Sequence, residues 1–429
     1  MSFEALSKLM LTRRQSLAGF ALAAAGLVGA RTAEAATSIS LLCPRSPDPT
    51  PPGYGGYAET QTDDWQTNNR AFINYEAVAW EQVHDKIAAG FDGRAAMHDI
   101  NYTAGWIPEF SADLAKFDGK ILPSMVMDLP GSSAHAVTWH GVRYGAPLSL
   151  SILTLHYNEA HFRDAGITAP PATWDELKHA AAALTTKDHA GWVINYGAPS
   201  GIGGTASYWM AFLQQAGGTL YGANGKAAFA SDEGVEALQF LIDLMPSTHE
   251  SALTSTSINE ATALFMTGKA SMMMNWPFMW GTINDRSLSL VANSVQTALL
   301  PAGPAGTASV DGADAWTVSA RSKQQDLAAN LIQFYLSKEI QIQQAVSTGW
   351  LPIRLSAFDD DRVKKACPHG AIVAKQAAHP YSSFLTPDYD DVTRAIGTEL
   401  IKALSGKKKA KAALLAAADS VNAIVKSRS

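Results

Sequence analysis

The sequence contains little cysteine and little charge, and each shortage excludes some classes of protein. Cys43 and Cys367 are the only two cysteines among 429 residues, too few for a disulfide scaffold. We expect two buried thiols, with a single bond between them as the alternative. Charged residues make up 17% of the chain and hydrophobic residues 47%, which is typical of a globular protein. The length favours two domains over one.

Long apolar runs are also missing after the first forty residues, so no segment there is predicted to span a bilayer. The beginning of the chain differs. Arg13 and Arg14 precede the apolar run 18–30, and the small residues of 33–35 fit a signal-peptidase site. We predict a twin-arginine export signal over residues 1–35.

Two features of this region limit the mode of export. Ser16 stands where twin-arginine signals usually carry phenylalanine, so general secretion stays an alternative. Cys43 lacks the small preceding residue that lipid attachment requires. We therefore expect an exported, soluble periplasmic protein without a lipobox.

The mature protein is expected to be mildly acidic. Removal of residues 1–35 takes away four cations and two anions, so the formal net charge changes from -6 to -8. Nucleic-acid binding without sequence preference requires clustered cations, so we expect no nucleic-acid partner. The basic run 407–411 lies in an alanine-rich stretch of helical character, and we interpret it as a solvated surface.

Strand-like and helix-like segments alternate along the first part of the chain. Residues 38–43 and 71–78 are predicted strands, residues 80–89 have the spacing of a helix, and residues 98–102 are strand-like again. This alternation predicts an α/β fold with largely parallel sheets.

Capping signals mark the helices that follow. Thr173 and Glu176 have the spacing of a capping box, and Ser231 is placed to cap a helix that runs to Met245. Gly268 is expected to end a helix in the left-handed conformation, just before a predicted strand over 270–275.

The segment after that strand is unusually aromatic. Residues 270–280 read ASMMMNWPFMW, and Pro277 marks the end of the strand and the start of a helical turn. Ligands of open α/β sheets bind beyond the carboxyl ends of strands, where Trp276 and Phe278 are predicted to stand. Core packing is the alternative for Trp276 and the preferred interpretation for Trp280.

Catalytic motifs are absent from the sequence. It contains no Gly-x-Ser-x-Gly, His-Glu-x-x-His, phosphate-binding loop or dinucleotide fingerprint. The acidic run 388–391 lacks the glycine and closing glutamate of a calcium loop, and we interpret it as solvated acids. We expect no enzyme activity, no catalytic residues, no cofactor and no metal site.

Several phrases, in a shared order over residues 75–355, resemble the family 1 extracellular solute-binding proteins of ABC importers. Each phrase alone is weak evidence, and their combined spacing carries the resemblance. They are Tyr144-Gly-Ala-Pro147, Leu155-His-Tyr-Asn158, Thr173 to Leu177, Gly217 to Tyr221, Phe265 to Asn275, Gly312 to Ser322 and Thr348 to Pro352.

The resemblance implies a two-lobed periplasmic-binding-protein fold of class II, similar to maltose-binding protein. Each lobe would be a mainly parallel sheet flanked by helices, with the ligand cleft between the lobes. The first lobe is expected at 37–147 plus 311–347, and the second at 148–310 plus 348–429.

The resemblance also implies a function. A monomer would capture a sugar, oligosaccharide or polyol by hinge closure and deliver it to the permease subunits at the membrane. Aromatic rings would pack on the apolar faces of the ligand and polar groups would bind its hydroxyls. By family position, the ligand-binding residues would be Thr103, Trp106, Tyr208, Trp276, Phe278, Asp314 as a hydroxyl acceptor, and Trp350.

Two alternatives stay open at this point. One is a secreted carbohydrate-active enzyme. The other is the same fold with an anionic or peptide-like solute, for which Arg143 or Arg354 would supply the cation. Tyr102 and Trp316 are expected in the core, because alternate residues of a strand face opposite ways.

Overall fold

The computed structural model describes residues 37–44, 53–54, 57–58, 62–199, 201, 204–312, 314–382 and 386–427. The predicted export signal over residues 1–35 lies outside these ranges, as does most of the Pro/Gly-rich segment 44–57. No helix within the described ranges combines the length and the apolar character needed to cross a membrane.

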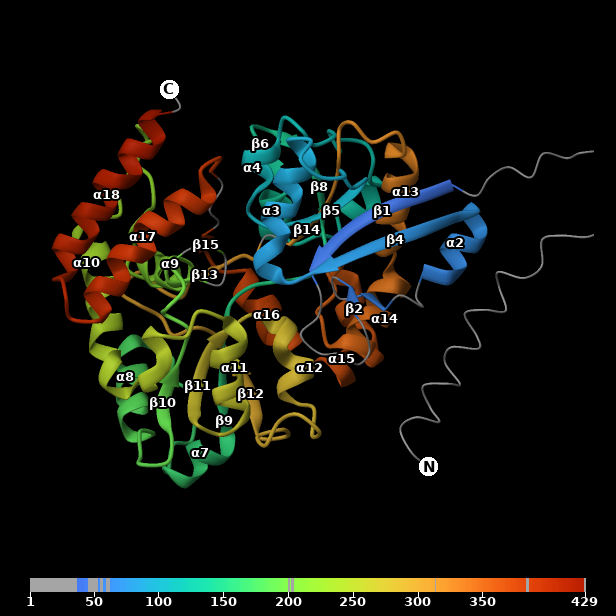
Figure 1. The fold of residues 1–429 in the computed structure, drawn as a ribbon. Coiled ribbons are helices and arrows are strands. Elements are labelled where there is room, and N and C mark those ends of the chain that lie inside the picture. The colour runs from blue at the N-terminus through green and yellow to red at the C-terminus, as the bar shows by residue number, and fades with distance from the viewer. Residues whose placement is uncertain are drawn as a thin grey trace, which may run out of the picture. The chain divides into compact units, whose positions relative to one another are not determined.

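The first sheet has five strands in the order β4-β1-β5-β14-β8 (Figure 1). Helices α3 and α13 pack against its strands β5 and β14. The strands and helices are β1 (Thr37–Pro44), β4 (Ala71–Val78), β5 (Ile100–Thr103), β8 (Gly145–Pro147), β14 (Ala315–Val318), α3 (Trp80–Phe91) and α13 (Gln325–Tyr335).

The second sheet has four strands in the order β10-β11-β9-β12. Helices α8 and α11 pack against β10 and β11. The elements are β9 (Thr154–Asn158), β10 (Ala190–Val193), β11 (Ala270–Asn275), β12 (Val295–Ala298), α8 (Trp174–Ala183) and α11 (Ile258–Met266).

Both sheets are mixed, so the expectation of mainly parallel sheets was wrong. Parallel pairing joins β1 to β5 and β10 to β11. Antiparallel pairing joins β14 to β5 and β8, and β9 to β11 and β12. The physical reason is that β9 and β14 each follow a segment that crosses from the other sheet, so they do not follow the right-handed crossover helix that makes neighbouring strands parallel.

A layer of four helices lies beside the second sheet. Helix α10 packs on α8, and α9, α10, α17 and α18 pack on one another, as Figure 1 shows for α10, α17 and α18. Their bounds are α9 (Thr205–Gln215), α10 (Asp232–Leu244), α17 (Tyr389–Leu404) and α18 (Ala410–Ser427).

The remaining elements are short. The helices are α2 (Asp63–Asn69), α4 (Ile107–Phe110), α5 (Pro123–Val126), α6 (Gly131–Ala136), α7 (Glu159–Asp164), α12 (Trp280–Ile283), α14 (Lys338–Thr348), α15 (Asp361–Ala366) and α16 (Gly370–Ala377). The 3-10 turns are η2 (Met245–Ser247), η3 (Glu250–Leu253), η4 (Pro277–Met279) and η5 (Leu355–Asp359). The strand pairs are β2 (Gly53–Tyr54) with β3 (Tyr57–Ala58), β6 (Thr138–Trp139) with β7 (Val142–Arg143), and β13 (Ser309–Val310) with β15 (Tyr381–Ser382).

The predicted caps at Thr173, Ser231 and Gly268 are confirmed, although the glutamate of the Thr173 capping box reaches the amide one residue before the cap. The Thr173 hydroxyl accepts a hydrogen bond from the Glu176 amide at 3.3 Å, and the Glu176 carboxylate accepts one from the Ala172 amide at 2.6 Å. Ser231 caps α10 by accepting from the Gly234 amide. Gly268 has φ +71°, as a left-handed helix end requires.

Two segments connect the two sheets, and a third segment runs beside them. Residues 148–153 join β8 to β9, residues 310–314 lead into β14, and residues 349–353 follow α14. The first two run antiparallel, with hydrogen bonds from the Gly312 amide to the Ser151 carbonyl at 2.7 Å and from the Leu148 amide to the Asp314 carbonyl at 3.0 Å. The Leu150 amide donates to the Leu351 carbonyl at 3.3 Å. We call these three segments the crossover segments.

Gly312 permits the close approach of two crossover segments. A Cβ atom at this position would collide with the Ser151 hydroxyl, so a larger residue there would require the Ser151 side chain to move.

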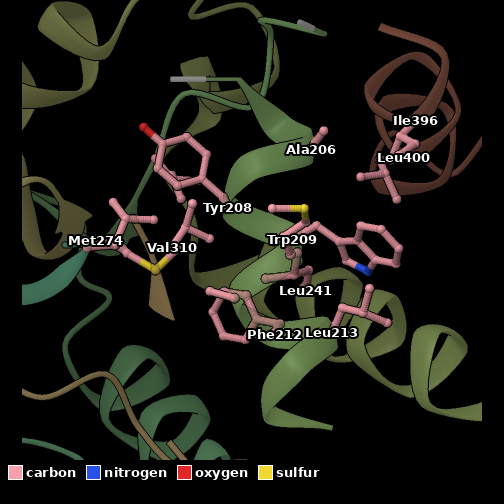
Figure 2. Packing of buried hydrophobic residues seen from close by; sticks show 14 of the residues in the cluster. Ala206, Tyr208, Trp209, Phe212, Leu213, Leu241, Met274, Val310, Ile396 and Leu400 are labelled. Carbon is pink, nitrogen blue, oxygen red and sulfur yellow. The ribbon is translucent and has the colours of Figure 1, made fainter. Parts of the chain in front are cut away.

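The largest hydrophobic cluster draws on both sheets. It contains Val83 and Trp106 from the side of the first sheet, and Met272 and Trp276 from the second. Figure 2 shows part of it, with Tyr208 and Trp209 leaving α9 on opposite sides.

Cys43 and Cys367 are buried and unpaired thiols, as the sequence favoured. Burial raises the pKa of each thiol to about 12, which suppresses the reactive thiolate form.

Candidate functional site

The end of β11 is built by the sequence Asn275-Trp276-Pro277. The Asn275 side chain is held by donation to the Thr262 hydroxyl at 3.0 Å and accepts from the Trp276 amide at 2.8 Å. Pro277 then opens the η4 turn. The indole ring of Trp276 is thereby directed away from the sheet toward helix α9.

Trp276 meets Tyr208 there. The two ring centroids are 5.6 Å apart with an interplanar angle of 50°. The Tyr208 hydroxyl donates to the Asn195 side-chain oxygen at 2.7 Å, which fixes the ring. Figure 2 shows Tyr208 on the same side of α9 as Met274 and Val310. Two of the residues expected to bind the ligand therefore form one aromatic wall.

The Trp276 indole N–H is buried and has no hydrogen-bond partner among the described residues. It lies beside the crossover segments, because a Cβ atom on Gly312 would be 3.2 Å from this nitrogen. A buried donor without an acceptor costs about 1–3 kcal/mol. An acceptor on a bound molecule would recover that cost.

Asp314 supplies a carboxyl group on the same crossover segment as Gly312. Burial is the main cause that raises the pKa of Asp314 to about 7, and the negative charge of Asp311 raises it further. Hydrogen bonds with Tyr102 and Ser151 stabilise the carboxylate and partly lower the pKa again. Near neutral pH this carboxyl therefore lies close to its midpoint and is able to accept or to donate a hydrogen bond.

Trp106 lies on the other side of the cluster, between the end of β5 and the start of α4. It is 4% exposed. Its ring stacks on Trp80 with centroids 5.5 Å apart, and it meets the His84 ring edge at 5.2 Å. Its indole N–H also lacks a hydrogen-bond partner in the described part of the chain.

Phe278 and Trp350 form a second aromatic pair. Their ring centroids are 5.4 Å apart, and both side chains are only partly buried. Phe278 packs against the cluster that contains Trp106 and Trp276. Trp350 follows Gly349, whose φ of +75° ends α14.

The structure thus brings the expected residues into three neighbouring groups. Tyr208 and Trp276 pair beside Gly312, two residues before Asp314, and Phe278 pairs with Trp350. Trp106 belongs to the same hydrophobic cluster as Tyr208 and Trp276. Thr103 is fully buried in β5, and its hydroxyl donates to the Ala315 carbonyl at 3.5 Å. Its hydroxyl is therefore engaged within the first sheet, next to Ala315.

Two polar residues at this site were not singled out from the sequence. Ser151 and Tyr102 each hydrogen-bond to Asp314. Tyr102 was expected in the core, and it does pack there with Trp316. The alternation of Ser149 and Ser151 within the apolar run 148–153 was the one signal that could have pointed to Ser151.

Of the two cations considered for an anionic ligand, Arg354 already has partners. The Arg354 guanidinium donates to the Asp128 carboxylate at 2.6 Å and to the Leu336 carbonyl at 3.0 Å. Arg143 ends the small β7 strand. Arg354 is therefore committed to a structural ion pair.

The interpretation of the acidic run 388–391 as solvated acids was wrong for part of the run. Asp388 is buried, and the partly buried Asp390 carboxylate lies 3.7 Å from the His84 ring nitrogen. Asp391 is exposed, as expected. Within the described residues, no group of three or more His, Cys, Asp or Glu side chains is arranged to hold a metal ion.

Comparison with known proteins identifies the class. The family described as bacterial extracellular solute-binding protein matches residues 51–342, more than half of the chain. The chain belongs to this family. It is therefore an exported solute-binding protein of the kind that serves ABC transporters, and not an enzyme.

Relatives by sequence are distant but cover much of the chain. A probable amino-acid ABC transporter periplasmic-binding protein of Sinorhizobium fredii is 24% identical over 308 residues, covering 69% of this chain and 69% of the relative. A putative binding protein of Brucella abortus is 23% identical over 381 residues, covering 87% and 90%.

Solved structures share the fold. A solute-binding protein of Agrobacterium radiobacter in complex with ribitol has a TM-score of 0.77 at 21% identity, covering 90% of this chain and 98% of its own. The maltose-bound MalE3 of T. maritima has a TM-score of 0.77 at 23% identity, covering 91% and 100%. A protein of Agrobacterium vitis with bound D-mannitol has a TM-score of 0.77 at 22% identity, covering 92% and 99%. The two-lobed α/β binding-protein fold is confirmed.

Proposed function

We propose that this protein captures a neutral sugar, oligosaccharide or polyol and delivers it to the permease subunits of an ABC importer. The observation that carries the proposal is that the Tyr208–Trp276 wall lies beside Gly312, on the crossover segment that also carries the buried Asp314 carboxyl. A pyranose or polyol has apolar C–H faces for aromatic rings and hydroxyls for polar side chains. This wall offers both within one site.

The buried indole N–H groups of Trp106 and Trp276 support the same ligand class. Both lack a partner in the described part of the chain, and ligand hydroxyl oxygens would accept from them. Several proteins of the same fold carry ribitol, maltose or D-mannitol in their solved structures, and these are neutral molecules rich in oxygen.

An anionic or peptide-like solute is the second candidate, and one relative is named for amino-acid transport. Recognition of a carboxylate usually requires a free arginine or lysine. Arg354 is already paired with Asp128, and the buried ionisable group on the crossover segment beside Trp276 is a carboxyl, Asp314. These observations favour the neutral ligand.

The proposed mechanism is closure of two lobes about the crossover segments. The lobes are 37–147 plus 311–347 and 148–310 plus 348–429, and the ligand-binding residues are Trp106, Tyr208, Trp276, Phe278, Asp314 and Trp350, with Thr103 engaged within the first sheet. Contacts made to both lobes exist only in the closed form, so a ligand shifts the population toward it. The site of action is the periplasm, reached through the signal at residues 1–35, with the protein acting as a monomer.

A thermal-shift panel tests the proposal. A ligand that binds only the folded protein raises its melting temperature by mass action. We expect at least one member of a panel of mono-, di- and oligosaccharides and sugar alcohols, each at millimolar concentration, to raise it. A shift with amino acids or organic anions, and none with the carbohydrate panel, would overturn the proposal.

A further inference from the structure

His84 joins three elements that are distant in the sequence. It lies on α3, beside the first sheet. Its Nε2 atom is 3.1 Å from both carboxylate oxygens of Glu109 on α4, and its Nδ1 atom is 3.7 Å from the Asp390 carboxylate on α17. Helix α17 packs in the layer of α9, α10 and α18 beside the second sheet. The contact between His84 and Asp390 therefore crosses from one half of the fold to the other.

The same imidazole supports the ring expected to bind ligand. His84 meets Trp106 with centroids 5.2 Å apart at 64°, and Phe110 at 5.3 Å. Trp106 also stacks on the ring of Trp80. A change in the position of His84 would therefore be transmitted to Trp106.

We infer that His84 is a positioning residue of the binding site, which holds the Trp106 ring and, by pairing with Asp390, ties that ring to helix α17 of the other lobe. This inference rests on the proposed function, since Trp106 is one of the residues proposed to bind the ligand. The pair would contribute to affinity although neither partner touches the ligand.

The charges around His84 fix the expected pH dependence. The groups that face it are Asp85 on its own helix, Glu109 on α4 and Asp390 on α17. Burial disfavours the imidazolium, but the hydrogen bond and charge of Glu109, with the charge of Asp390, outweigh it and raise the pKa of His84 to about 9.

Asp390 faces His84, Glu109 and Asp85, with Arg394 on its own helix, and burial raises its pKa. Because the pKa of His84 is raised, the stabilisation by its charge is fully present below pH 6.5 and is lost as the pH rises through about 9. The tie between Trp106 and α17, and with it ligand binding, should therefore weaken in that window.

Nuclear magnetic resonance of the histidine ring protons tests the contact without any ligand. The signal of His84 is assigned by its loss in His84→Gln. We expect a titration midpoint near 9 in the wild-type protein and a lower midpoint in Asp390→Asn. Asp92→Asn is the matched control, because Asp92 lies at the end of α3 and pairs with Arg94. It should leave the midpoint unchanged.

Equal midpoints in the wild type and Asp390→Asn would overturn the inference, because they would mean that His84 and Asp390 do not meet in solution. This result does not bear on whether a sugar binds, which the thermal-shift panel decides separately.

The affinity of the protein for D-mannitol and maltose tests whether the His84–Asp390 pair positions the binding site. At pH 7 we expect Asp390→Asn to weaken binding about fivefold, the size of a partly exposed ion pair. At pH 10 the difference from the wild type should vanish. Equal affinities at pH 7, with the probe bound by both proteins, would contradict the positioning role. If neither probe binds the wild type, the positioning role falls together with sugar binding, while the titration midpoints still report the contact.

Discussion

The rings of Tyr208 and Trp276 lie 5.6 Å apart, although one comes from helix α9 and the other from the end of strand β11. Two hydrogen bonds hold these residues in place. Asn195 accepts from the Tyr208 hydroxyl, and Asn275 accepts from the Trp276 amide. Both rings are therefore positioned before any ligand arrives, which lowers the entropy cost of binding.

Trp276→Phe should weaken sugar binding and change stability little. The substitution keeps an aromatic ring and removes the buried N–H that has no partner in the described residues. Loss of one hydrogen bond to the ligand corresponds to about 1 kcal/mol, or roughly fivefold in the dissociation constant. Isothermal titration calorimetry measures this change.

Trp209→Phe is the matched control. Trp209 lies on α9 and is fully buried, but it packs against Phe229 and leaves the helix on the side opposite Tyr208 (Figure 2). The Trp209→Phe variant should bind the sugar with the same affinity as the wild-type protein. Equal losses in the two variants would mean that Trp276 acts only through the core.

Asp314→Asn should remove a pH dependence of stability. The folded-state pKa of about 7 is raised above the ordinary value of 3.8, so the protonated carboxyl stabilises the fold. This stabilisation is complete below pH 3.8 and is lost as the pH rises through about 7. At about 1.36 kcal/mol per pKa unit, the loss is on the order of 4 kcal/mol.

Urea unfolding between pH 4 and pH 9 measures this effect. The wild-type free energy of unfolding should fall across the range relative to that of Asp314→Asn. Asp326→Asn, which changes an exposed carboxylate paired with Lys120, should keep the wild-type slope. Parallel curves for wild type and Asp314→Asn would show that the carboxyl is ionised at all these pH values.

Arg354→Gln should destabilise the fold without abolishing sugar binding. Arg354 and Asp128 are 12% and 17% exposed, and the same carboxylate accepts from the Ser356 amide at 2.8 Å. Loss of a hydrogen bond between charged groups costs about 2 kcal/mol. Urea unfolding measures this cost.

Arg362→Gln serves as the surface control, since Arg362 pairs with Glu339 while 52% exposed. It should change stability little. A large loss of sugar affinity in Arg354→Gln, at unchanged stability, would assign the guanidinium to the ligand and revive the anionic alternative.

The two cysteines should be inert in the native protein. Both are buried, and burial raises their pKa values to about 12. A thiol reagent such as Ellman's reagent should react with neither at pH 8 and with both after unfolding in guanidinium chloride. Rapid reaction of a native thiol would contradict the burial of β1 or of the α15–α16 region.

Local features of this fold could be predicted from the sequence because they depend on neighbours. The strands 71–78 and 270–275 and the caps Thr173 and Ser231 occur as expected. The placement of Trp276 beyond a strand followed from Pro277 alone. Each of these features is determined by residues that lie within a few positions of one another in the sequence.

Features that depend on crossing between the sheets could not be predicted in the same way. The antiparallel entry of β9 and β14 is set by the crossover segments. The contact of His84 with Asp390 depends on how α3 and α17 approach each other. The acidic run 388–391 looks like a solvated surface in the sequence, because only tertiary packing brings a histidine to it.

The most direct test of the central claim is native mass spectrometry of the purified full-length protein mixed with the carbohydrate and polyol panel. We expect a one-to-one adduct with the mass of a neutral polyhydroxy compound, retained by Trp209→Phe and reduced in Trp276→Phe. An adduct formed with amino acids or organic anions, but with no member of that panel, would contradict it.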